Sequence, residues 1–207
     1  MIAISTACKQ ALIGIEIGDK TISNSLPSNC KHSENILFTI DKMLDEIGEE
    51  FANNQTFAVV VGPGSFTGIR IGVSLIKGLL GGENQKVVVP ITTFDLMAYS
   101  YIKNFTIDDE FACIINGLSG YYFVCRYNKR GQKIGEEELV TTLPNCTLVG
   151  LEEEELGQVQ INPTAGELLQ LAKEKFNKGE AISAKEVCPL YLRKSQAESN
   201  LEDKKQS

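Results

Sequence analysis

The chain has 207 residues, which is enough for one large domain or two small ones. Its net charge of −7 argues against a protein that grips nucleic acid by itself, because such proteins carry a basic face or stripe. No apolar run reaches the length of a membrane span, and the N-terminus lacks the basic region of a secretory signal. We therefore expect a cytoplasmic protein that makes no membrane contact.

The six cysteines and the single histidine, His32, limit the chemistry open to the chain. No two cysteines form a C-x-x-C pair, so we expect free thiols, mostly buried as small hydrophobic residues. One histidine cannot supply the histidine pairs common in zinc sites, and nucleophilic catalysis by serine or cysteine would need His32 as its base. We therefore predict no catalytic residue, no metal ligand and no cofactor.

The first half of the sequence predicts strands and helices in alternation. Ala11–Ile17 alternates along the chain and is followed by a hairpin turn at residues 18–20. Ile36, Ile40 and Met43 recur at helical spacing, which predicts a helix that faces the core. Strands are expected at 1–5, 11–17, 21–26, 57–61 and 86–90, and helices at 33–49, at 65–80 and from Thr92 or Thr93 to about residue 101. This order predicts a mainly parallel sheet covered by helices.

The second half repeats the order of strands, hairpin and helix. Strands are expected at 111–115, 121–127, 133–143, 147–150 and 159–161, and a helix capped by Thr164 at 165–176. The acidic run 152–155 is expected to be a solvated loop, and 195–207 a frayed polar tail. The repeated order predicts an α/β fold with two lobes, at 1–104 and 105–194, joined near 102–110.

The chain is organised around residues 59–72, where an apolar strand meets a Gly-Pro-Gly turn and then a helix. Ser65 or Thr67 can cap that helix. Three interpretations compete for the glycines. A phosphate cradle lacks the Gly-Lys-Ser/Thr of a P-loop, and a dinucleotide fingerprint departs by one residue from G-x-G-x-x-G. The third interpretation, close packing along the helix face that carries Gly68 and Gly72, fits the residues best.

At this turn the sequence resembles the TsaB family, also called YeaZ-like. The resemblance runs along residues 62–72, continues at 77–79 and recurs at 4–6, 32–34 and 189–198. It implies an actin-like (ASKHA) fold, which is a duplicated two-lobe architecture of mixed sheets flanked by helices. The signature loop residues are Gly62, Pro63, Gly64, Ser65, Phe66, Thr67 and Arg70.

The resemblance also implies a function. TsaB proteins are non-catalytic partners that bind and activate TsaD, which transfers a threonylcarbamoyl group to the adenosine beside the tRNA anticodon. An ATPase, TsaE, joins the complex, and tRNA is reached only through it. The same helix face could also pair two copies of the chain by two-fold symmetry.

Two departures from the family pattern bear on the alternatives. Ser5 stands where the family usually carries an aspartate that helps organise metal and phosphate in actin-like ATPases, and residues 116–122 replace charged family residues. The alternative function is a stand-alone nucleotide-binding actin-like ATPase, against which Ser5 counts. A third alternative, a peptidase, is opposed by the single histidine.

We expect the partner to contact the two helices of the first lobe. Gly68 and Gly72 would let a partner helix approach closely, and substitution of Gly72 by leucine would then abolish pairing but leave the monomer folded. The candidate contacts are Ile36, Ile40, Met43, Gly68, Ile69, Gly72, Val73 and Ile76.

Overall fold

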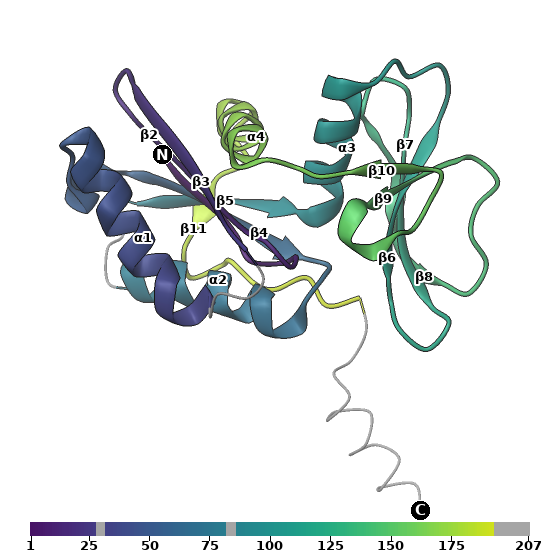
Figure 1. Ribbon diagram of the computed structural model, residues 1–207, viewed down its shortest axis with the longest axis horizontal. Coiled ribbons are helices and arrows are strands. Elements are labelled where there is room, and N and C mark those ends of the chain that lie inside the picture. The colour runs from purple at the N-terminus through teal and green to yellow at the C-terminus, as the bar shows by residue number, and fades with distance from the viewer. Residues whose placement is uncertain (28–31, 82–85, 193–207) are drawn as a thin grey trace, which may run out of the picture.

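The computed structural model describes residues 1–27, 32–81 and 86–192, and the side chains of helix α1 from residue 35 onward. The chain forms two mixed sheets flanked by helices, as predicted (Figure 1). The first sheet has the strand order β11-β5-β4-β1-β2-β3, with β1, β4 and β5 parallel and the strands at both edges antiparallel. Its strands are β1 (Ile2–Ser5), β2 (Ala11–Ile17), β3 (Lys20–Leu26), β4 (Thr56–Gly62), β5 (Val87–Thr92) and β11 (Ile182–Ser183).

Helices cover both faces of the first sheet. Helices α1 (His32–Ile47) and α2 (Phe66–Leu79) lie on one face, and α4 (Ala165–Asn177) lies on the other (Figure 1). The sheet is apolar on both sides because strands between two helical layers are buried on both faces, as β1 and β4 are. The main hydrophobic core therefore runs through this sheet.

The second sheet has the order β10-β9-β6-β7-β8. Its strands are β6 (Phe111–Asn116), β7 (Tyr122–Tyr127), β8 (Lys133–Val140), β9 (Thr147–Leu151) and β10 (Val159–Ile161). Helix α3 (Thr93–Asn104) stands between the two sheets and packs Phe94, Met97 and Tyr101 into the core of the second. The two sheets are thus joined by a buried helix and not by a loose linker alone.

The division into lobes at residues 104 and 105 stays a prediction, but the last part of the chain lies elsewhere than expected. Residues 162–194 were assigned to the second lobe. In the structure α4 packs on β1 and β2, and β11 pairs with β5, so this segment returns to the first sheet. The physical reason is that the apolar side of α4, with Leu168 and Leu169, completes the core on the open face of that sheet. The predicted tail at 195–207 lies outside the described residues.

Two local predictions were also wrong. The strand expected at 133–143 ends at Val140. The acidic run forms a 3₁₀ turn, Glu152–Glu154, whose carboxylates bond to backbone N–H groups of other segments and are not merely solvated.

Candidate functional site

The signature loop folds against the turn that follows β1. The side chain of Ser65 accepts a hydrogen bond of 3.2 Å from the Gly68 N–H and caps α2, as predicted. The Ser65 N–H in turn donates to the Ala7 carbonyl at 2.7 Å. Gly64 has a φ of +152°, and a Cβ there would overlap the Ala7 carbonyl oxygen. Glycine is therefore required at this point by both conformation and space.

Gly68 and Gly72 pack against the same turn. The Thr6 hydroxyl donates to the Gly68 carbonyl at 2.6 Å. A Cβ at Gly68 would overlap the Thr6 carbonyl oxygen, and one at Gly72 would lie 2.6 Å from Thr6 Oγ1. The segment that approaches this helix face is therefore the chain's own turn and not a partner helix. Because a side chain at Gly72 would collide with Thr6, we now expect Gly72→Leu to destabilise the monomer itself, in place of leaving it folded.

The remaining contacts of the loop reach two other segments. The Thr93 hydroxyl, at the start of α3, donates to the Pro63 carbonyl at 2.5 Å, and the Leu190 N–H donates to the Val61 carbonyl at 2.8 Å. The loop thus joins β1, α3 and the closing stretch of the chain. These contacts favour the packing interpretation of the glycines over a phosphate cradle or a dinucleotide fingerprint.

Arg70, an exposed residue of the signature, contacts the last described part of the chain at Tyr191. Its Nε donates to the Tyr191 hydroxyl at 2.9 Å, and its guanidinium lies 3.8 Å from the centre of the Phe66 ring. The two rings are themselves 5.0 Å apart. Thr67 is exposed beside this cluster.

The predicted partner contacts are buried inside this chain. None of the six apolar candidates exceeds 4% exposure, and all six belong to the main core. They form the inward stripes of α1 and α2, which face the first sheet, so they are not available as direct contacts. The expected partner contacts that the structure buries are Ile36, Ile40, Met43, Ile69, Val73 and Ile76, together with Gly68 and Gly72.

The outward face of the same two helices carries apolar residues that the sequence argument missed. On α1, Leu37 is 43% exposed and Phe38 58% exposed, with the Lys42 ammonium 4.5 Å from the centre of the Phe38 ring. On α2, Ile71 and Leu75 are half-buried. The sequence holds this signal for Phe38, which is apolar and falls outside the inward stripe, whereas the helical pattern counts Leu37 as part of that stripe. We call Leu37, Phe38, Ile71 and Leu75, with the small residues Ser74 and Gly78, the outer helix face.

Gly78 differs from the other glycines of α2. A Cβ built at this position meets no described atom within 4 Å, so the space above it is open. Ser74 and Gly78 are both exposed and lie one turn apart. They leave a low strip on the outer helix face where another backbone could approach.

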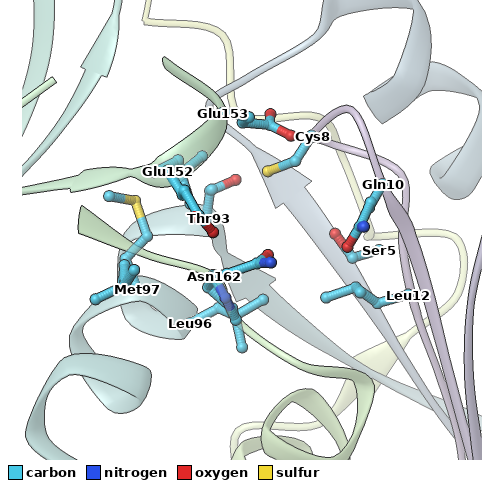
Figure 2. Close-up of a pocket in the computed structure, with 13 residues that line it drawn as sticks. Ser5, Cys8, Gln10, Leu12, Thr93, Leu96, Met97, Glu152, Glu153 and Asn162 are labelled. Atoms are coloured by element: carbon cyan, nitrogen blue, oxygen red, sulfur yellow. The ribbon is translucent and has the colours of Figure 1, made fainter. Parts of the chain in front are cut away.

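The cleft between the two sheets is nearly closed. Its cavity has a volume of about 30 Å³, room for a single water molecule. Figure 2 shows Ser5 of β1 and Gln10 of the turn before β2 on one side of it and Met97 and Glu152 on the other. Ser5, where the TsaB family usually has an aspartate, is buried at the end of β1.

Contacts between Glu153 and Lys9 link the two sides of this cleft, and the neighbouring Glu154 anchors the acidic turn to its own sheet. Glu153 accepts the Lys9 N–H with both oxygens, at 2.9 and 3.1 Å, and the Lys9 ammonium donates to the Glu153 carbonyl at 2.8 Å. Glu154 accepts the Asn116 N–H at 2.9 Å, and burial raises the pKa of its carboxyl above the usual value. Contacts from the acidic turn thus tie it to the loop after β1 and to the end of β6.

Cys8 is the cysteine that lines this cavity. Burial, with the charges of Glu153 and Glu154, raises the pKa of its thiol far above the ordinary value. The thiol therefore stays protonated and is a poor nucleophile or metal ligand. Within the described part of the chain, no three His, Cys, Asp or Glu side chains lie together as a metal site.

Comparison with known proteins identifies the family to which the chain belongs. A family model described as TsaD, tRNA N6-adenosine threonylcarbamoyltransferase, matches residues 27–143, more than half of the chain. The tRNA threonylcarbamoyladenosine biosynthesis protein TsaB of Haemophilus influenzae is 29% identical over 90% of this chain and 89% of its own. The chain belongs to this family and, within it, to the TsaB proteins.

A second TsaB protein is also similar to this chain over most of its length. TsaB of Escherichia coli is 23% identical over 84% of the chain and 86% of its own length. By contrast, the tRNA N6-adenosine threonylcarbamoyltransferase of Kosmotoga olearia is 30% identical over only 42% of the chain and 32% of its own. Similarity to TsaB proteins thus extends through both sheets.

Solved structures confirm the predicted fold. The crystal structure of YeaZ from Pseudomonas aeruginosa superimposes with a TM-score of 0.77, covering 92% of this chain and 98% of that one at 21% identity. The actin-like fold expected from the signature is therefore correct. In the described residues, no helix is both long enough and apolar enough to cross a membrane.

Proposed function

We propose that the chain is an accessory subunit in tRNA threonylcarbamoyladenosine synthesis, which binds TsaD and supports its transfer reaction without catalysing it. Similarity to two TsaB proteins over most of the chain supports the pathway. The observation that carries the partner role is the outer helix face, where the large apolar side chains of Leu37 and Phe38 are exposed by 43% and 58%. The complex is cytoplasmic, and TsaE joins it.

The outer helix face replaces the buried residues as the proposed contact surface. Exposed aromatic residues near the centre of a surface often dominate binding. Burial of Leu37 and Phe38 against a partner would each stabilise the complex by roughly 1.5–3 kcal/mol before entropic costs. The low strip at Ser74 and Gly78 would admit the backbone of a partner helix.

A pair of helices of TsaD is the partner element that we expect to pack on the outer helix face. TsaD is expected to share the fold, because the family model that bears its name matches this chain across α1, α2 and α3. A TsaD helix pair could then pack on the outer helix face much as a second copy of this chain would. The same surface therefore also serves a homodimer, which would compete with the heterodimer.

The alternative function, a stand-alone nucleotide-binding ATPase, has less support. A cavity of about 30 Å³ is far smaller than the several hundred Å³ of sites that hold small organic ligands. The contacts of Glu153 with Lys9 would have to break before a nucleotide could enter. Tight ATP binding to the isolated chain in calorimetry would revive this alternative.

Reconstitution tests the proposal. Unmodified tRNA would be incubated with TsaD and TsaE from the same source, ATP and threonylcarbamoyl-adenylate, with and without this chain. We expect modification to depend on the chain and to be lost with Phe38→Glu, but retained with Phe105→Glu. Both phenylalanines are exposed, Phe38 by 58% and Phe105 by 46%, but Phe105 lies beyond α3, away from the outer helix face. Equal activity with and without the chain would refute the proposal.

A further inference from the structure

A second hollow shares no lining residue with the cleft or with the outer helix face. It is formed between α3, the C-terminal half of α4 and the loop that joins β7 to β8, and its volume is about 360 Å³. That volume falls within the range of sites that hold small molecules. Ala98, Ile102 and Leu171 supply its apolar wall, and charged side chains surround them.

The carboxylates of this hollow already have partners. Asp95 accepts the Tyr127 hydroxyl at 3.0 Å and lies 3.3 Å from the Lys175 ammonium. Glu180 pairs with the same Lys175 at 2.5 Å. Glu174 accepts the Tyr99 hydroxyl at 3.2 Å. Two of these three carboxylates thus share one cation, and the third, Glu174, is hydrogen-bonded to a neutral hydroxyl.

Among the described residues, three of the four cations that line the hollow have no carboxylate partner. Lys103 donates to the neutral Gln170 amide oxygen. Across residues 1–27, 32–81 and 86–192, no carboxylate lies within ion-pair distance of Lys103, Arg130 or Lys178. All three side chains line the hollow. With four cations and three carboxylates in its lining, the hollow has a net charge of +1, in a chain whose net charge is −7.

The loop that carries Arg130 is held in a defined position. The Asn128 carboxamide oxygen accepts the Arg130 N–H at 2.9 Å and the Gln132 N–H at 3.1 Å. Gly131 has a φ of +75°, and a Cβ there would overlap the Ile102 side chain of α3. The tight fit against α3 keeps the start of the Arg130 side chain at the rim of the hollow, so little backbone entropy is lost when a ligand binds it.

We propose that this hollow binds a small organic anion, a molecule that carries one or two carboxylate or phosphate groups. Arg130 and Lys178 would hold the anionic group by charge-assisted hydrogen bonds, with Lys103 adding charge, and the wall at Ile102 would receive the carbon skeleton. A polyanion such as RNA fits less well, because three carboxylates share the hollow and would face its phosphates. The proposal does not depend on the partner role, since the hollow lies within one chain.

Isothermal titration calorimetry of the full chain tests this site. The probes are succinate for a carboxylate ligand and inorganic phosphate for a phosphate ligand, each titrated into wild type, Arg130→Gln and Lys129→Gln. Lys129 is exposed next to Arg130 but does not line the hollow, so it is the matched control. We expect saturable one-to-one binding of at least one probe, weakened about tenfold or more by Arg130→Gln and unchanged by Lys129→Gln.

Three results would overturn the proposal. One is the absence of saturable binding of both probes up to millimolar concentrations. Another is binding that Arg130→Gln leaves unchanged, which would place the anion elsewhere. The third is tighter binding of a short single-stranded RNA with the same dependence on Arg130, which would make the surface an RNA contact. Because Arg130 is exposed, its substitution should leave the fold intact, and the thermal unfolding curve of the variant checks this.

Discussion

Gly72 and Gly78 lie on the same helix but should respond to the same substitution in opposite ways. A Cβ at Gly72 would lie 2.6 Å from Thr6 Oγ1, whereas one at Gly78 meets open space. We expect Gly72→Ala to lower the free energy of unfolding by about 1–3 kcal/mol through overpacking. Gly78→Ala should raise it by about 0.5–1 kcal/mol, because alanine loses less backbone entropy in a helix. Urea unfolding of both variants measures the difference, and equal effects would contradict the packing described here.

Cys8 provides a second test at the residue scale. Because burial raises the pKa of its thiol, it should resist iodoacetamide in the native protein at pH 8. The exposed Cys188 should be alkylated first. Mass spectrometry of tryptic peptides after timed quenching separates the two sites. Fast modification of Cys8 would show that the cleft opens in solution and would remove one objection to nucleophilic chemistry there.

At the scale of elements, a buried carboxylate couples α3 to α4. Glu167 forms a capping box with Thr164 and accepts hydrogen bonds from Ser100 Oγ at 3.2 Å and Asn104 Nδ2 at 2.8 Å. We expect Glu167→Ala to destabilise the chain by about 1–3 kcal/mol, because the cap is lost and two donors lose their partner. Thermal unfolding measures this. A variant as stable as wild type would mean that water replaces these bonds at no cost.

The contribution of Glu154 to the stability of the folded chain should depend on pH. Burial raises the pKa of its carboxyl in the folded state, so its contribution to stability is fully present below the unfolded pKa and is lost as pH rises through the folded pKa. Glutamine keeps an oxygen that can accept the Asn116 N–H but carries no charge. Glu154→Gln should therefore unfold at a higher temperature than wild type at pH 8, with the difference vanishing near pH 4. A lower melting temperature at pH 8 would contradict this assignment.

Local patterns predicted the elements well, whereas contacts between distant segments could not be predicted from one sequence. The alternation in 11–17 and the caps at Ser65 and Thr164 are encoded within a few residues, and all are present. The identity of the group that packs on Gly68 is not local, because Thr6 lies 62 residues earlier. The helix stripe likewise predicts that Ile36 and Ile40 face something apolar, but not whether that is the chain's own sheet or a partner.

For the whole molecule, the return of α4 and β11 to the first sheet makes the two sheets one interdependent structure. The chain crosses from the first sheet to the second and back, and Glu153 closes the cleft between them. Such an arrangement suits a rigid platform that presents α1 and α2, and it leaves the cleft with a cavity of only about 30 Å³. We therefore propose that the chain acts through the outer helix face and not between the lobes.

Size-exclusion chromatography with light scattering tests that claim most directly. The chain would be run alone, with TsaD from the same source, and as Phe38→Glu with TsaD, with Phe105→Glu as the control. We expect a one-to-one complex for wild type and Phe105→Glu, and separate peaks for Phe38→Glu, whose charge would be buried at the interface. A complex that forms equally well with Phe38→Glu would show that TsaD binds another surface. No complex with any form would mean that the shared signature records a common fold only.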